Sequence, residues 1–341
     1  MIWLVFAFAA LASYVLTGTL RSYALKRSLL DTPNARSSHT TPTPRGGGMA
    51  IVIMFLGLIL VLWHWGSVDE PLAFALLGTG SGIAALGFAD DHGHIAARWR
   101  LLGHFVGASW SLFWLGGLPP LVIFGALFDL GWTGHLLAVF FLVWLLNLYN
   151  FMDGIDGIAA VQAICACGGA VLCYAAADSS GLALVTGVPE LLLVGAVAGF
   201  FCWNFPRARI FMGDAGSGFL GIVIGVFALQ AAGQEPRLFW SWLILIGVFV
   251  VDATFTLLRR LLRGEAVYQA HRSHAYQAAA RRFGRHVPVT LSVALIDLCW
   301  LLPWALGVAA GRVDGAVALM IAYLPLMGLC IWLRAGAAER V

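Results

Sequence analysis

Residues 147–157 read Asn-Leu-Tyr-Asn-Phe-Met-Asp-Gly-Ile-Asp-Gly, directly after a wholly apolar run at 136–146. The run predicts a membrane helix, and the spacing of three between Asn147, Asn150 and Asp153 places them on one helix face. Two Asp-Gly pairs then end the helix at a polar surface. Amides and carboxylates at a membrane helix end are energetically costly and indicate a functional site. A helix end closed by glycine, with solvated acids, gives the same pattern, so this stretch alone leaves both interpretations open.

The composition predicts an all-α polytopic membrane protein. Of the 341 residues, 61% are hydrophobic and 11% are charged, and the mean hydropathy is +0.88. A soluble protein of this length needs polar outer faces on its helices, so a soluble fold is excluded. The six cysteines lie in apolar segments and do not show the spacing of disulfides or metal ligands. This indicates that they serve as small buried hydrophobic side chains. No nucleic-acid partner is expected, and the net charge of +3 becomes informative only when assigned to the two sides of the membrane.

About eleven apolar segments are long enough to cross a bilayer. They are 1–20, 48–66, 71–89, 101–117, 134–150, 157–177, 189–204, 216–232, 238–258, 288–310 and 315–333. Basic residues follow the first segment rather than precede it, which predicts a retained helix instead of a cleaved signal peptide. The interrupted segment 118–133 predicts a short external hairpin at the membrane interface. We therefore expect one integral membrane domain over residues 1–341.

The positive charges fix a predicted orientation. If the N-terminus lies outside, 18 of the 20 lysines and arginines fall on the cytoplasmic side, and only Arg237 and Arg312 fall outside. That asymmetry follows the positive-inside rule and supports the assignment of spans. An odd number of helices then places the C-terminus in the cytoplasm. With this orientation the expected location is the inner, cytoplasmic membrane.

In this topology the candidate catalytic residues lie at the cytoplasmic ends of the helices. Asp90, Asp91, Asp153, Asp156 and Asp214 all lie there. Five carboxylates on one face would repel one another unless they were compensated. A divalent cation together with an anionic substrate would compensate them, and hard oxygen ligands favour Mg²⁺ or Mn²⁺.

The same face carries groups that bind anions. The run Gly-Asp-Ala-Gly-Ser-Gly at 213–218 opens a helix, where free backbone N–H groups can cradle a phosphate. Arg45 and the arginines and histidines of the loop 259–287 lie on this side as well. Arginines at this level also serve as topology signals or contacts to anionic lipid, and that alternative stays open for most of them.

These stretches together resemble the polyprenyl-phosphate N-acetylhexosamine-1-phosphate transferases, the superfamily that contains MraY and WecA (glycosyltransferase family 4). The resemblance covers nearly the whole chain. Its motifs are Asp-Thr-Pro-Asn-Ala-Arg-Ser-Ser-His at 31–39, Pro-Thr-Pro-Arg-Gly-Gly-Gly at 42–48, Asp90-Asp91, the stretch 147–157, the segment 211–221, and Arg259-Arg260 before a loop with histidines. Within the superfamily it looks closest to the WbpL-like enzymes that initiate O-antigen synthesis.

The resemblance implies transfer of N-acetylhexosamine 1-phosphate from a UDP-sugar to undecaprenyl phosphate, with release of UMP and dependence on Mg²⁺. It implies that Asp214 is a metal ligand with Asn150 nearby, and that Asp90 and Asp91 are catalytic. The substrate-binding residues predicted with it are Asn147, Asp153, Asp156, Arg45, Asn204, Gly213, Ser217, His271, Arg272 and His274. Membrane lipids are further partners, and self-association is left open.

One departure concerns the loop at 271–277, His-Arg-Ser-His-Ala-Tyr-Gln, where Tyr276 and Gln277 replace histidines common in the family. We hypothesise that this loop lies over the sugar and that Tyr276 and Gln277 favour a 6-deoxy donor. Direct attack by the lipid phosphate and a covalent aspartyl intermediate both stay open. A transporter of anionic sugars or nucleotide sugars is the alternative function. Transporters usually show internal repeats and polar residues near the middle of the membrane, whereas here the acids gather at one surface.

Overall fold

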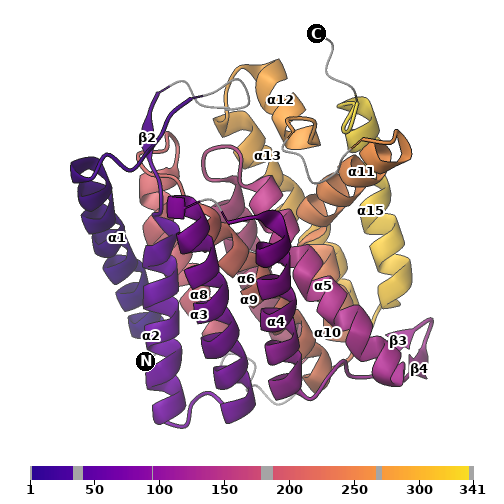
Figure 1. The fold of residues 1–341 in the computed structure, drawn as a ribbon. Helices are drawn as coiled ribbons and strands as arrows, with labels where there is room; N and C mark the ends of the chain where they lie inside the picture. The colour runs from indigo at the N-terminus through magenta and orange to yellow at the C-terminus, as the bar shows by residue number, and fades with distance from the viewer. Residues whose placement is uncertain (1, 34–40, 94, 178–186, 266–270, 338–341) are drawn as a thin grey trace.

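The computed structural model describes residues 2–33, 41–93, 95–177, 187–265 and 271–337 as a bundle of helices with two short hairpins (Figure 1). The helices are α1 (Ile2–Lys26), α2 (Gly48–His64), α3 (Glu70–Gly93), α4 (Ala97–Leu115), α5 (Gly131–Met152), α6 (Ile158–Ala177), α8 (Val188–Asn204), α9 (Asp214–Gln234), α10 (Arg237–Leu245), α11 (Gly247–Leu262), α12 (Ala275–Phe283), α13 (Val287–Ile296), the π-turn η1 (Asp297–Leu301), α14 (Leu302–Ala309) and α15 (Gly315–Trp332). The antiparallel strand pairs are β1 (Leu30–Asp31) with β2 (Thr43–Pro44), and β3 (Leu121–Ile123) with β4 (Ala126–Phe128). Part of the motif at 31–39 lies outside the described residues.

The apolar segments predicted from the sequence fall on helices, and the chain is a polytopic membrane protein. Seven helices of the described chain are long and apolar enough to cross a membrane, and the bent pair α10–α11 gives an eighth. The apolar helices α2 and α8 are shorter, with 17 residues each. The count of eleven spans and the outside position of the N-terminus stay predictions.

Two of the predicted spans depart from a regular α-helix, although 288–310 is confirmed as an apolar helix long enough to span a membrane, Val287–Ala309. The span 238–258 is broken at Ile246, where α10 and α11 meet at 71°. The span 288–310 is interrupted by η1, in which the backbone widens to π-geometry. The residues on both sides of each break are apolar, so a hydropathy profile shows no boundary at either position.

The hairpin predicted at 118–133 is present as β3–β4, at the end of the bundle away from α12 (Figure 1). The Trp240 indole donates to the Val122 carbonyl over 2.7 Å, and the Gly125 amide donates to Asp314 over 3.1 Å. These bonds hold the hairpin against α10 and the start of α15. Its placement outside the cell stays a prediction.

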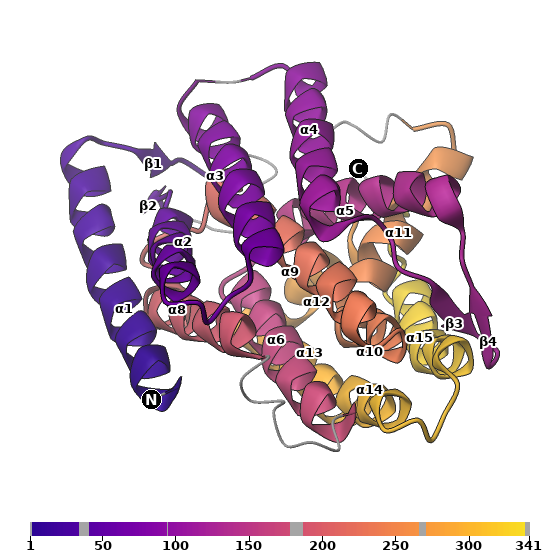
Figure 2. The same cartoon turned by 90° about the horizontal axis from the view of Figure 1, so that it is seen from below.

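Helix α9 stands in the centre of the bundle (Figure 2). In its apolar window 94% of the residues are buried, against 17% for α1 at the edge. Small residues let neighbouring backbones approach it closely, as membrane helix packing requires. A Cβ on Gly221 would lie 2.6 Å from the Leu145 carbonyl oxygen of α5. A Cβ on Gly87 of α3 would lie 2.6 Å from the backbone of Ala215. The packing thus brings the ends of α3 and α5 to the first turn of α9.

Candidate active site

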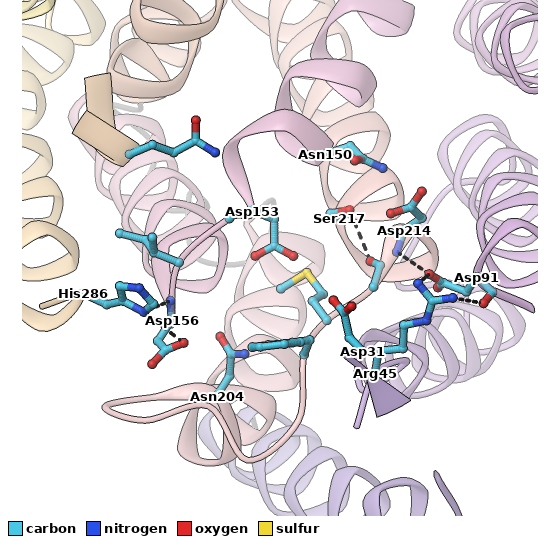
Figure 3. A pocket seen from close by; sticks show the side chains of 16 residues that line it. Asp31, Arg45, Asp91, Asn150, Asp153, Asp156, Asn204, Asp214, Ser217 and His286 are labelled. Atoms are coloured by element: carbon cyan, nitrogen blue, oxygen red, sulfur yellow. Dashed lines mark hydrogen bonds and ion pairs between the residues drawn. The ribbon is translucent and has the colours of Figure 1, made fainter. Parts of the chain in front are cut away.

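A cavity of about 260 Å³ opens where the ends of α3, α5 and α9 meet the β1–β2 hairpin and α12 (Figure 3). Five carboxylates contribute to its lining, together with one arginine and one histidine. The lining residues are Asp31, Arg45, Asp91, Asn150, Asp153, Gly154, Ile155, Asp156, Asn204, Phe211, Met212, Gly213, Asp214, Ser217, Gln277 and His286. Most of the predicted site residues therefore meet in one place.

The end of α5 delivers Asn150 and Asp153 to the cavity. The helix stops at Met152, and Asp153 leaves helical geometry with φ −88° and ψ 49°. Asn150 lies beside the Asp214 carboxylate (Figure 3). Asn147 was predicted to share this face and to bind substrate, and its role in binding stays a prediction. Its amide donates to the Val143 carbonyl over 2.7 Å and lies 3.3 Å from His104, so it does not line the cavity.

The Asp91 carboxylate sits at the N-terminus of α9. It is buried, and its two oxygens lie 3.4 Å from the backbone nitrogens of Asp214 and Ala215. Negative charge is stabilised at this end of a helix. The Arg45 guanidinium donates to the Asp91 carbonyl and lies 3.8 Å from its carboxylate. Asp91 is thereby fixed between a helix dipole and a cation.

The same contacts correct the predicted phosphate cradle. The next two amide groups of α9, those of Gly216 and Ser217, both donate to the Gly213 carbonyl over 3.1 Å. The Ser217 hydroxyl donates to the same carbonyl over 3.2 Å. Because the first-turn N–H groups are already paired, the expectation that they hold a substrate phosphate is wrong for this conformation. Gly213 and Ser217 do line the cavity.

Gly213 has φ +78°, and a Cβ there would lie 2.7 Å from an Asp91 carboxylate oxygen. Gly213→Ala is therefore expected to displace Asp91 and to lower turnover by on the order of 10- to 100-fold. Steady-state turnover and the melting temperature of the purified protein check this. Gly233→Ala is the matched control, because Gly233 belongs to the same helix and has open space around it. Equal turnover in the two variants would contradict the role given to Gly213.

Asp90 does not line the cavity, although it was predicted to act beside Asp91. Adjacent helix residues point about 100° apart, and Asp90 faces α4. Its carboxylate accepts the Ile95 amide over 2.7 Å and a close bond from the Arg100 guanidinium. The same guanidinium lies 3.5 Å from Asp214. Asp90 thus holds a cation next to the cavity rather than facing substrate.

If Asp90 acts through Arg100, the losses of turnover caused by Asp90→Asn and Arg100→Gln should not be additive. Asp90→Asn is expected to lower turnover by about tenfold or more, since the released guanidinium can neutralise Asp214. The double variant with Arg100→Gln should be no worse than Asp90→Asn alone. Turnover of the two single variants and the double variant measures this. A double variant whose loss equals the product of the single losses would show that Asp90 acts independently.

The other end of the cavity is built around Asp156. Its carboxylate lies 3.2 Å from Nδ1 of His286, and its carbonyl accepts the Thr290 hydroxyl over 2.8 Å. Asn204 accepts the Gly157 amide over 2.8 Å and donates to the Ile210 carbonyl over 2.9 Å. Asn204 therefore braces the turn after α5 against the loop before α9. These contacts explain why Asp156 and Asn204 meet in the cavity.

Two polar lining residues, Asp31 and His286, were missed by the sequence predictions of the site, whereas Gln277 belongs to the loop that was predicted to lie over the sugar. Asp31 reaches the cavity because Leu30 and Asp31 pair with Pro44 and Thr43, next to Arg45. His286 lies directly before α13, and Gln277 is in the first turn of α12. Asp31 belongs to the motif at 31–39, which points to the site only through the family resemblance. His286 ends a basic loop that contains two other histidines, so the sequence pattern does not distinguish it from them.

The predictions for the loop at 271–277 need correction. His271, Arg272 and His274 do not line the cavity, and His274 is buried against Asp252. Burial, followed by the neighbouring His274 and Arg260, lowers the pKa of His271 to about 4. Tyr276 is buried and its hydroxyl donates to the Phe151 carbonyl over 3.0 Å, so it presents no surface to a sugar. That Tyr276 reads the C6 position stays a prediction, which this buried geometry does not support.

The carboxylates that line the cavity favour the binding of a cation. Burial, followed by the charges of Asp214, Asp156 and Asp91, raises the pKa of Asp153 well above its ordinary value. Among the described residues no three acidic, histidine or cysteine side chains converge tightly enough to hold an ion unaided. Mg²⁺ typically uses one or two carboxylates and completes its shell with substrate phosphates and water. Asp214, about one-third exposed, with Asn150 beside it, fits that donor set.

The fold and the cavity define a polytopic membrane protein with an acidic site at one end of its bundle. The sequence profile of glycosyl transferase family 4 matches residues 73–232. A Bacillus subtilis protein named as a probable undecaprenyl-phosphate N-acetylglucosaminyl 1-phosphate transferase is 30% identical, over 81% of this chain and 77% of its own. A Mycobacterium tuberculosis decaprenyl-phosphate N-acetylglucosaminephosphotransferase is 28% identical over 84% and 78%. A Moorella thermoacetica phospho-N-acetylmuramoyl-pentapeptide-transferase is 32% identical over 64% and 69%. The chain belongs to the polyprenyl-phosphate sugar-1-phosphate transferases of glycosyl transferase family 4.

Proposed function

We propose that this protein transfers an N-acetylhexosamine 1-phosphate from a UDP-sugar to undecaprenyl phosphate and releases UMP. The reaction takes place at the cytoplasmic face of the bacterial inner membrane and depends on Mg²⁺, with Mn²⁺ as a substitute. The product starts an O-antigen, lipopolysaccharide or related envelope glycan. N-acetylglucosamine is the first sugar to test, because two of the relatives carry it in their names.

The observation that carries the proposal is the acidic cavity at the end of an apolar bundle. An acceptor lipid must keep its chain in the bilayer, while a nucleotide sugar arrives from water. A site at the bundle end, walled by α3, α5 and α9, meets both requirements. Its five carboxylates would repel a pyrophosphate without a cation, so the site is built for a metal–pyrophosphate pair.

The chemistry is a substitution at the sugar-bearing phosphorus of the donor. An oxygen of the lipid phosphate forms a new P–O bond, the bond to the bridging oxygen breaks, and UMP leaves with that oxygen. Mg²⁺, when bound at Asp214 and Asn150, would neutralise charge on the pyrophosphate. Asp91, fixed by Arg45 and α9, accepts a remaining proton of the lipid phosphate. Asp153 and Asp156 flank the nucleoside end of the donor.

The test is UMP release by the purified protein in detergent with UDP-N-acetylglucosamine, undecaprenyl phosphate and Mg²⁺. Release should require all three and should cease when a chelator removes the metal. Exchange of labelled UMP into the donor without lipid would establish the covalent route instead. Movement of the nucleotide sugar across proteoliposomes without UMP release would support the transporter alternative. A panel of 6-hydroxy and 6-deoxy donors then identifies the sugar.

A further inference from the structure

Helix α11 carries a buried carboxylate that none of the proposed steps uses. Asp252 is 4% exposed and accepts three hydrogen bonds. They come from the amides of Ala275 over 2.8 Å and Tyr276 over 2.9 Å and from the Thr256 hydroxyl over 3.1 Å, and Nδ1 of His274 lies 3.4 Å from the same carboxylate. A buried carboxylate is tolerated only when it is satisfied in this way. Two of the three donors are the first amides of α12, so Asp252 caps that helix from another helix.

Helix α12 depends on such anchors for its position. Its nine residues are too few for a helix to persist by itself in water. Besides Asp252, the Ser273 carbonyl accepts the Gly336 amide over 2.7 Å, and the Arg282 guanidinium stacks 4.3 Å from the Trp332 ring. Those two contacts hold the flanks of α12 on the end of α15. Asp252 binds the backbone amides of the turn that begins the helix, where His274 and Gln277 also form a capping box.

That first turn reaches the cavity by two routes. Gln277 lines the cavity directly. Tyr276 donates its hydroxyl to the Phe151 carbonyl, in the last turn of α5, over 3.0 Å. The same hydroxyl lies so close to Gly154 that a Cβ there would collide with it. Because Gly154 follows Asp153, a shift of α12 would move both the Gln277 wall and the turn that presents Asp153.

We propose that Asp252 is a positioning residue for the donor. By capping α12 it sets Gln277 and, through Tyr276, the turn at Asp153 and Gly154. It touches no substrate, so its loss should weaken donor binding more than it slows the chemical step. The kinetic part of this inference rests on the proposed function; the structural part does not.

The test compares Asp252→Asn and Asp252→Ala with Thr256→Val in the full-length protein. Thr256 binds the same carboxylate without touching α12, so its variant is the matched control. Hydrogen exchange of the Ala275 and Tyr276 amides should become about tenfold faster or more in both Asp252 variants, and should stay near wild type in Thr256→Val. The donor KM should rise about tenfold while kcat changes less than about threefold.

Tyr276→Phe gives a second measurement that does not depend on the cap. It should raise the donor KM with α12 amide exchange unchanged, and its effect should be less than multiplicative with that of Asp252→Asn. Unchanged exchange and donor KM in Asp252→Asn, with only a lower melting temperature, would overturn the proposal. If wild type releases no UMP, the proposed function fails, whereas faster α12 exchange would still establish the cap. If Asp252→Ala does not fold, Asp252→Asn and Tyr276→Phe decide the question.

Discussion

Asp214→Asn is expected to reduce UMP release by on the order of 10³-fold or more while leaving the protein folded in the membrane. Asp214 begins α9 at the centre of the bundle and extends a partly exposed carboxylate into the cavity beside Asn150. The substitution preserves shape and removes the charge that would hold the cation. Steady-state UMP release, measured over a range of Mg²⁺ concentrations, checks the prediction.

The control is Asp314→Asn, which makes the same chemical change at the start of another membrane helix. Asp314 caps α15 by accepting the Ala316 amide over 3.0 Å and the Val317 amide over 3.2 Å, away from the cavity. Asparagine is also a good N-cap, so this variant should keep near-normal turnover. Near-normal turnover of Asp214→Asn at saturating Mg²⁺ would contradict the assignment of Asp214 as a metal ligand.

The helices could be predicted because each apolar segment is bounded by polar residues or glycine. The breaks within the bundle could not. At Ile246 the residues on both sides are apolar, so no polar boundary marks the 71° bend. The π-turn at Asp297 likewise lies within an apolar run. Such bends depend on packing between helices, which hydropathy does not register.

The site was predictable where the carboxylates themselves carry the signal. Asp91, Asp153, Asp156 and Asp214 stand at helix ends on one predicted side, and the structure brings all four to one cavity. The direction in which each of these side chains points was not predictable. Asp90 and Asp91 are neighbours in the sequence, but only the close approach of α3 to Ala215 decides which of them faces α9.

Residues that enter the cavity from connecting segments were the hardest to find. His286 ends the basic loop, and its position follows from long-range contacts such as that of Thr290 with Asp156. Gln277, in the short helix, was predicted to lie at the sugar, and its place in the cavity depends on the contacts of Asp252 with α12. Local sequence patterns favoured His271 and His274 instead. His274 is used in the structure to support α12. Histidine content alone therefore does not separate support from contact with substrate.

Asp91→Asn is expected to lower kcat by on the order of 10²- to 10³-fold while changing the donor KM little. The Asp91 carboxylate is buried at the positive end of α9 and 3.8 Å from Arg45. An asparagine keeps one acceptor for the α9 amides but cannot accept a proton from the lipid phosphate. Rates at saturating donor, with the acceptor varied, separate the two parameters.

Melting temperature distinguishes a chemical role for Asp91 from a structural one. Asp91→Asn keeps an acceptor for the α9 amides, so the melting temperature is expected to change little while turnover falls. Asp90→Asn is its closest neighbour for comparison and leaves the α9 amides paired. A loss confined to donor affinity would move Asp91 to nucleotide binding. A loss of kcat in a well-folded Asp91→Asn variant would support a role for the Asp91 carboxylate in the chemical step. Its contacts with Arg45 and α9 would then hold it in position for that step.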